Sequence, residues 1–199
     1  MEIRRFKSVG PVIVGCIGLI IFAACTPRTH MRDVADAQVQ STPKPSEAMV
    51  IFLRPDQKHG WRAISLFDVV DGKPKFIGIL PEKKKIAYAT TPGKHRFMMV
   101  PTGTLTEFLI ADLAQGKTSY VGIGTSDRSP NLFLEPYRGD TLNSSAFAKD
   151  LRKTTWVVNT PNSQRWAHNK RFSIEKKVMS FPAWSERSKV PDLLPEDGR

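Results

Sequence analysis

The sequence predicts a mainly β protein: a small antiparallel β-sandwich or open barrel over residues 48–137, followed by one or two C-terminal helices. Three observations predict this fold. Short apolar runs recur from Ala48 onward, turn signals separate them at intervals of about 8–12 residues, and no helical periodicity of useful length occurs before Pro136. Regularly spaced short strands of this kind are typical of sandwiches and barrels.

The expected strands follow one another with recognisable turns between them. Residues 49–53 form an uninterrupted apolar run, which predicts a strand buried on both faces. Residues 71–72 (Asp-Gly) and 91–94 (Thr-Pro-Gly-Lys) predict turns, because glycine adopts a positive φ without strain and proline fixes φ near the value that a turn requires. The other strands are expected over residues 62–70, 76–80, 86–91, 95–100, 105–113, 118–123 and 132–134.

Residues 138–184 are expected to form a helical extension. Ser144 or Ser145 is the predicted cap of a first short helix, because serine at the N-cap accepts a hydrogen bond from a backbone N–H of the first turn. One more strand is expected over residues 154–158. The last segment, residues 185–199, carries prolines and glycine among charged residues and is predicted to be a disordered tail.

A second helix is expected from a cap at Asn162 or Ser163 to about Val178. Trp166, Ile174 and Val178 are separated by multiples of four residues, so they form a narrow apolar stripe along one side of this helix. The stripe either packs on the sheet, which is the simpler interpretation, or docks a partner.

The N-terminal segment, residues 1–24, has the features of a secretory signal. Arg4, Arg5 and Lys7 precede an apolar run over residues 9–24. This run is shorter than the roughly 20 residues that a membrane-spanning helix needs, and a positive start before a short apolar run is typical of a signal peptide.

The apolar run ends in Phe22-Ala23-Ala24-Cys25, which resembles the lipobox of bacterial lipoproteins. That resemblance implies cleavage between Ala24 and Cys25 and a diacylglyceryl group on the Cys25 thiol, with acyl chains such as palmitate. Phe22 stands where the family usually has leucine, and its size disfavours ordinary cleavage after Ala24. Thr26, in a position where aspartate often marks retention in the inner membrane, implies the periplasmic face of the outer membrane. An uncleaved anchor and free secretion are the alternatives.

Residues 25–47 are predicted to be a flexible tether, because they contain few large apolar residues and Pro43 and Pro45 interrupt any helix. As a coil they would span roughly 25 Å, enough to lift a domain off the lipid headgroups. Since cleavage removes Cys16 and acylation occupies Cys25, no thiol remains for a disulfide or for a cysteine-based metal site.

The chain is strongly basic, with a net charge of +11. The first 24 residues contribute three cations and one anion, so residues 25–199 carry +9. In an exported protein this charge does not indicate nucleic acid as a partner. Lipid headgroups, lipopolysaccharide phosphates and cell-wall carboxylates are the acidic partners that an envelope offers, although much of the charge is expected to be solvated surface.

Five elements of the β region occur in a recognisable order: residues 48–55 (AMVIFLRP), 77–80 (IGIL), 92–95 (PGKH), 113–121 (LAQGKTSYV) and 134–136 (LEP). Their order and spacing resemble the bacterial domain-of-unknown-function family 2846, whose members are typically small exported proteins, many with lipoprotein signals. The resemblance covers about residues 48–137. It implies the fold and an exported location, but no activity and no site residues. The chain has Ser-Tyr at 119–120 where the family often has Tyr-Tyr.

No catalytic motif is found: the sequence lacks a Gly-x-Ser-x-Gly elbow, a phosphate-binding Gly-rich loop and a His-Glu-x-x-His helix. We therefore expect no enzyme activity, no metal and no cofactor besides the lipid on Cys25, and the sequence identifies no small-molecule substrate. A convergence of His95, Asp68 and a hydroxyl would instead favour an enzyme of envelope maintenance. Glu107 and Asp112 are expected to be exposed charges on opposite faces of a strand.

Four side chains are candidates for contact with a partner: Trp61, His95, Trp166 and Ile174. Trp61 is expected in a loop, where it could stack on a sugar, and His95 is interpreted as a structural residue or as a ligand contact. The sequence thus predicts a lipid-anchored envelope protein that binds or scaffolds another component without catalysis. The alternatives are a binding module for the cell wall or an acidic glycan, and an accessory lipoprotein subunit of a secretion or efflux assembly.

Overall fold

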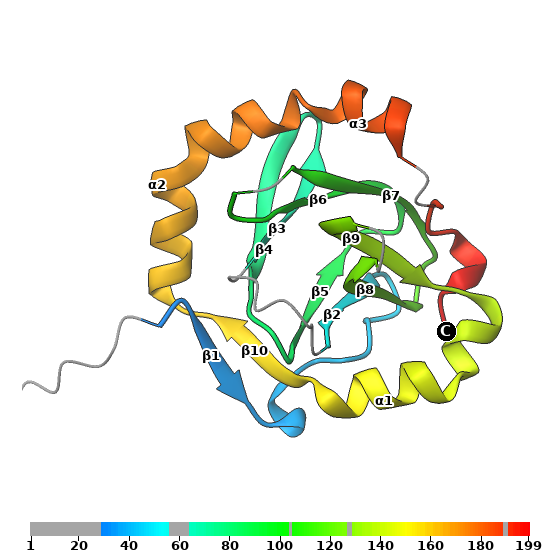
Figure 1. The fold of residues 1–199 in the computed structure, drawn as a ribbon. Coiled ribbons are helices and arrows are strands. Elements are labelled where there is room, and N and C mark those ends of the chain that lie inside the picture. Colours follow the sequence, from blue (N-terminus) through cyan, green and yellow to red (C-terminus); the bar gives the residue numbers. More distant parts are fainter. Residues whose placement is uncertain (1–28, 56–63, 104, 127–128, 189–190) are drawn as a thin grey trace, which may run out of the picture.

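The computed structural model describes residues 29–55, 64–103, 105–126, 129–188 and 191–199. Over these residues the fold is mixed α/β and mostly strand. A six-stranded mixed sheet faces a four-stranded antiparallel sheet (Figure 1), and neither closes into a barrel. The predicted mainly β fold with C-terminal helices is therefore confirmed at this level.

The six-stranded sheet has the order β1-β10-β5-β2-β8-β9. Its strands are β1 (Met31–Val34), β2 (Ala48–Arg54), β5 (Lys84–Thr90), β8 (Thr118–Ser126), β9 (Ser129–Tyr137) and β10 (Thr155–Asn159). The prediction that all strands pair antiparallel is wrong, because β2 pairs with β8, and β10 with β5, in parallel. A tight hairpin turn can join only antiparallel strands. Parallel pairing is possible here because long stretches of chain separate the two strands of each parallel pair.

The four-stranded sheet has the order β4-β3-β6-β7 and is antiparallel throughout. Its strands are β3 (Ile64–Val70), β4 (Lys73–Leu80), β6 (Gly93–Val100) and β7 (Glu107–Leu113). Asp71 and Gly72 join β3 to β4 with positive φ angles of 49° and 74°, which confirms the predicted hairpin turn.

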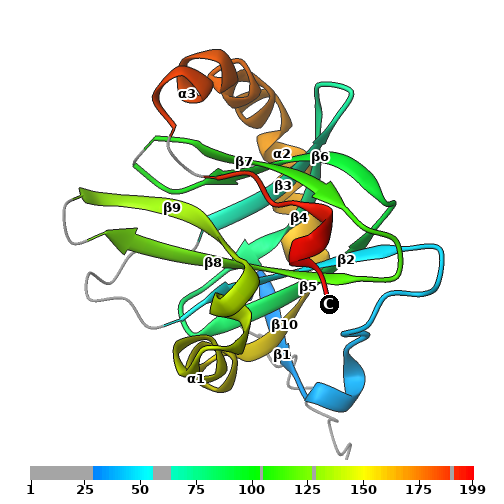
Figure 2. The same ribbon diagram turned by 90° about the vertical axis from the view of Figure 1, so that its right-hand side faces the viewer.

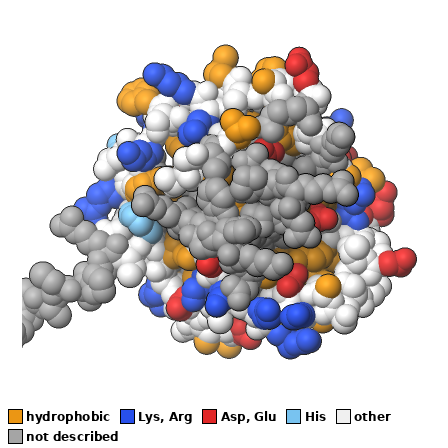
Figure 3. All heavy atoms as spheres, viewed as in Figure 1, with side chains coloured by type: hydrophobic (Ala, Val, Ile, Leu, Met, Phe, Trp, Pro, Cys, Tyr) orange, Lys and Arg blue, Asp and Glu red, His pale blue; other side chains and the backbone are white. Residues whose placement is uncertain are grey.

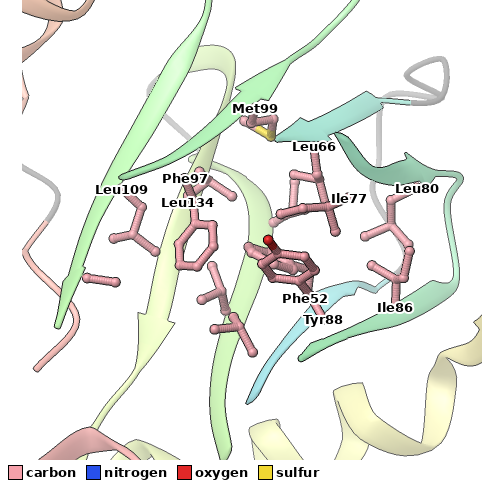
Figure 4. Packing of buried hydrophobic residues seen from close by; sticks show 14 of the residues in the cluster. Phe52, Leu66, Ile77, Leu80, Ile86, Tyr88, Phe97, Met99, Leu109 and Leu134 are labelled. Carbon is pink, nitrogen blue, oxygen red and sulfur yellow. The ribbon is translucent and has the colours of Figure 1, made fainter. Parts of the chain in front are cut away.

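The main core lies between the two sheets. All seven residues of β2 are buried, so the strand predicted to be buried on both faces is confirmed. Phe52 from the six-stranded sheet meets Phe97 from the four-stranded sheet edge to face, with ring centroids 5.3 Å apart. Figure 4 shows these rings together with Leu66, Tyr88 and Leu134 in the space between the strands.

Helices cover both outer faces, so the molecule has four layers (Figure 2). α1 (Ser145–Lys153) lies against the six-stranded sheet, with Leu151 packed beside Met49 and Ile51. α2 (Pro161–Val178) and α3 (Phe181–Arg187) lie against the four-stranded sheet. Short 3-10 turns are η1 (Asp36–Gln38), η2 (Gly139–Asn143) and η3 (Pro195–Asp197). No described helix is long and apolar enough to cross a membrane.

The predicted N-cap residue is confirmed for α1 but not for α2. Ser144 caps α1 by accepting a hydrogen bond from the backbone N–H of Phe147. The cap of α2 is Thr160 and not Asn162 or Ser163. Pro161 explains the shift, because proline suits the first position of a helix, where its missing N–H leaves no hydrogen bond unmade.

The predicted tether is folded over its described part, which corrects that prediction. β1 pairs antiparallel with β10 at the edge of the six-stranded sheet. The hydroxyl of Thr160 donates to the backbone carbonyls of Thr29 and His30, at 2.9 and 3.0 Å. Composition could not indicate this, because the unpaired edge that binds β1 is supplied by a strand more than a hundred residues later.

The predicted disordered tail is also wrong over residues 191–199. Leu193 is completely buried and forms a parallel bridge with Ala111 of β7. Further along, the backbone N–H and carbonyl groups of Arg199 and Thr118 bond to each other at 3.0 and 2.8 Å. A polar segment is thus held by backbone hydrogen bonds along strand edges, and one leucine fills the core.

Candidate functional site

A buried polar cluster joins the two sheets. Asp68 of β3 and His95 of β6 come from the four-stranded sheet, and Tyr88 of β5 comes from the six-stranded sheet. The Nδ1 atom of His95 lies 2.9 Å from Oδ2 of Asp68, and the Tyr88 hydroxyl donates to the same oxygen at 3.0 Å. All three side chains are buried.

Strand alternation explains why these polar groups point inward. Ile64 and Leu66 of β3 contribute to the core between the sheets, and Asp68 continues this period of two. On β6, Phe97 belongs to the same core and His95 lies two residues before it. The imidazole ring stacks on the Phe97 ring, with centroids 5.8 Å apart and planes inclined by 6°.

The surroundings of His95 favour a proton on each ring nitrogen. Its Nδ1 faces the carboxylate of Asp68, and its Nε2 lies 2.9 Å from the carbonyl oxygen of Thr91. Both partners are acceptors, so only the imidazolium form makes both hydrogen bonds. The hydrogen bond to Asp68 raises the pKa of His95 above its ordinary value, although burial acts in the opposite direction.

Burial keeps Tyr88 in its neutral form. Removal from water raises the pKa of the Tyr88 hydroxyl, and the nearby negative charge of Asp68 raises it further. The hydroxyl therefore remains a hydrogen-bond donor to Asp68. The ammonium group of Lys75 lies 5.4 Å from the centroid of the Tyr88 ring, which places a cation at the outer side of the cluster.

An open hollow of about 640 Å³ lies next to the cluster. Its lining includes Asp68 and His95 together with three further charged residues, Glu47, Lys75 and Lys94. Oδ1 of Asp68 is buried and has no hydrogen-bond partner among the described residues. The hollow thus combines charged side chains of both signs.

The hydrogen bonds of the cluster do not follow the arrangement of a nucleophilic triad. In such a triad the hydroxyl gives its proton to a histidine nitrogen, and a carboxylate orients that histidine from the other side. Here the Tyr88 hydroxyl donates to Asp68, and the second nitrogen of His95 is bonded to Thr91. His95, Asp68 and a hydroxyl do converge, but this arrangement leaves no ring nitrogen free to accept a proton from a substrate.

Metal binding has no support in the part of the chain that the structure describes. No group of three or more His, Cys, Asp or Glu side chains is arranged there to hold a metal ion. Asp68 and His95 form a pair and not a ligand set of the size that structural or catalytic zinc requires.

The other candidate residues lie either outside the described part of the chain or on α2. Ala24, Cys25 and Trp61 lie outside the described residues. Ile174 is buried against the outer face of the four-stranded sheet. Trp166 is half-buried, with its ring 6.0 Å from that of Phe76, so the apolar stripe of α2 packs within this chain, as the simpler interpretation expected.

Trp166 also lines a second hollow at the start of α2. This hollow measures about 400 Å³ and is bordered by His30, Asn162, Arg165 and Asn169. The rings of His30 and Trp166 meet edge to face at 6.4 Å. One side of Trp166 thus remains open to a partner at the end of the molecule where β1 begins.

Glu107 corrects the expectation of an exposed charge. It is buried, and Oε2 accepts a hydrogen bond of 2.8 Å from the indole nitrogen of Trp184. Trp184 belongs to α3, which packs over β7. The alternation of residues along the strand could not predict this contact, because the covering helix lies more than seventy residues later in the chain.

Tyr88 is the member of the cluster that the sequence analysis did not name. Its strand, β5, belongs to the other sheet, and only the packing of the two sheets brings it within reach of Asp68. A second buried charge, Arg54, ends β2 and donates to the carbonyl of Leu80 at 3.0 Å. Burial lowers the pKa of Arg54, and the carboxylate of Glu82 partly offsets this effect.

No family model matches the chain, and no curated protein matches it. An NMR structure of a protein from Eubacterium rectale is similar over 54% of this chain and 97% of that chain, with 13% sequence identity and a TM-score of 0.36. The resemblance to family 2846 stays a prediction.

Proposed function

We propose that this chain is a lipid-anchored protein of the bacterial cell envelope that binds or scaffolds another envelope component and has no catalytic role. The sequence Phe22-Ala23-Ala24-Cys25 carries this proposal. It combines a lipobox-like ending with a short apolar run and a positive start, which together are typical of a lipoprotein signal. Thr26 favours the periplasmic face of the outer membrane.

The hydrogen-bond pattern of the polar cluster supports a binding or scaffolding role over catalysis. A histidine that acts as a general base needs a free ring nitrogen, and both nitrogens of His95 face acceptors. The pair of Asp68 and His95 instead fixes β3, β6 and the β5–β6 turn relative to one another, with Tyr88 joining the second sheet. We therefore assign the cluster a structural role, in which it holds these elements together.

The mass of the N-terminal fragment tests the proposal. The fragment is taken from protein purified from membranes, and a Cys25→Ala variant serves as the control. We expect a fragment that begins at an acylated Cys25, while the control retains residues 1–24, because lipoprotein cleavage requires the modified cysteine. A fragment with an unmodified Cys25 would overturn the proposal.

A further inference from the structure

The chain enters the folded domain beside the N-terminus of α2. Thr29 and His30 are bonded to Thr160, the cap of that helix. Three residues lie between Cys25 and Thr29, and the four steps from one to the other reach at most about 14 Å when fully extended. An anchor on Cys25 therefore holds this end of α2 near the lipid headgroups. Most of the predicted tether is folded into the domain, so it does not lift the domain away from the membrane.

The outward face of α2 carries cations and large apolar side chains together. We define this face by Arg165, Phe172, Lys176 and Met179, whose spacings of seven, four and three residues place them on one side of a helix. Phe172 is 70% exposed and Met179, at the C-cap, is 80% exposed. They are the two most exposed large apolar side chains of the described residues, and the opposite side of the helix buries Ile174.

The charge of α2 is strongly positive. The helix contains five cations and one carboxylate: Arg165, Lys170, Arg171, Lys176, Lys177 and Glu175. The carboxylate of Glu175 is already paired with Arg171 at 3.7 Å. Figure 3 shows several Lys and Arg side chains on the side of the molecule where α2 runs in Figure 1, and others along its lower edge.

We propose that the outward face of α2 docks on the anionic phospholipid headgroups of the membrane that anchors Cys25. The inference rests on the proposed acylation of Cys25. Cations beside exposed aromatic or apolar residues are typical of helices that lie in the plane of a membrane interface. Arg165 and Lys176 would contact lipid phosphates, and Phe172 and Met179 would enter the headgroup layer. The short reach from Cys25 makes a bilayer the surface that this face meets first.

Fluorescent labelling of the acylated, full mature protein tests this orientation. With Cys16 removed and Cys25 acylated, an introduced cysteine is the single free thiol. Asn169→Cys places an environment-sensitive label beside the outward face of α2. Asn143→Cys is the matched control, because it is also an exposed asparagine and lies in η2 on the opposite side of the molecule (Figure 1). Both proteins are reconstituted into phosphatidylcholine vesicles with and without phosphatidylglycerol.

We expect the label at position 169, and not at 143, to shift to the blue and to be quenched by lipid-borne nitroxides when phosphatidylglycerol is present. Arg165→Gln with Lys176→Gln should lower the ratio of docked to undocked protein about 25-fold, since each cation contributes about fivefold to attraction by an anionic surface. Lys149→Gln with Lys153→Gln on α1 removes the same charge elsewhere and should leave the ratio unchanged.

The outcomes separate this inference from the proposed function. If the mass shows an acylated Cys25 but the labels at positions 169 and 143 respond alike, the docking is wrong and the lipid anchor stands. A response at 169 in native membranes that is lost in lipid vesicles would assign the face to a protein partner and overturn the docking. An unmodified Cys25 removes the anchor and, with it, the docking that depends on it.

Discussion

Both ring nitrogens of His95 face hydrogen-bond acceptors in a buried environment, which favours the imidazolium form. The charge is balanced by Asp68, whose Oδ2 also accepts the hydroxyl of Tyr88. A buried ion pair gains little net stability when intact, but breaking it leaves an uncompensated charge. The consequences of this pair are therefore clearest when a proton or one partner is removed.

The raised pKa of His95 makes stability depend on pH. The folded protein holds the His95 proton more tightly than the unfolded chain, whose histidine titrates at about pH 6.5. The contribution is fully present below that pH and is lost as the pH rises through the folded-state pKa. We expect the free energy of unfolding, measured by urea denaturation, to fall over this range. A His95→Gln variant with the same pH slope would contradict this prediction.

Removal of the Asp68 charge should be costly. Asp68→Asn leaves the His95 imidazolium without its counter-ion, and we expect a loss of about 3–5 kcal/mol in the free energy of unfolding at pH 6. Tyr88→Phe removes one hydrogen bond and keeps the ion pair, so it should cost about 1 kcal/mol. Thermal or chemical denaturation of the two variants tests the difference, and equal losses would mean that the ion pair is not formed.

At the scale of elements, β10 lies between β1 and β5 in the six-stranded sheet and leads directly into the start of α2. Asn159, its last residue, donates to the carbonyl of Ile77 on β4 at 2.7 Å and accepts from the hydroxyl of Ser163 at 3.0 Å. Gly78 lies under this junction, where a Cβ atom would be 2.5 Å from the Cδ1 of Ile86. Strand β4 can approach β5 of the six-stranded sheet here because residue 78 has no side chain.

Gly78→Ala should therefore destabilise the fold. We expect a loss of about 1–3 kcal/mol from overpacking, measured as the free energy of unfolding. Gly124→Ala in β8 is the matched control, since its Cβ would meet its nearest neighbour, the ring of Phe133, at an ordinary 3.4 Å. Equal effects of the two substitutions would show that space at Gly78 is not limiting.

At the scale of the whole molecule, three apolar clusters are stacked through four layers. One lies between the sheets, one beneath α2 and α3, and one beneath α1. The C-terminal segment adds a further connection, because it bonds to β7 of one sheet through Leu193 and to the start of β8 of the other sheet through Arg199 (Figure 2). The last residues thus link the two sheets at one side.

The contribution of this segment can be measured with two adjacent leucines. Leu193 is completely buried and Leu194 is 39% exposed. We expect Leu193→Ala to lower the free energy of unfolding by about 2–5 kcal/mol, because it leaves a cavity in the core. Leu194→Ala should change it by less than about 0.5 kcal/mol. A disordered tail would make both substitutions neutral, so the pair distinguishes the observed fold from the expectation based on composition.

The sequence by itself determined the local elements. The unbroken apolar run of β2, the Asp71-Gly72 turn and the serine before α1 each follow from side-chain pattern and backbone preference within a few residues. Only the tertiary structure decided which distant segments pair. The parallel alignment of β2 with β8, the pairing of β1 with β10, and the meeting of Tyr88 with Asp68 depend on strands far apart in the chain. Periodicity reports which face of a segment is buried, but the partner that buries it is chosen by the packing of the whole fold.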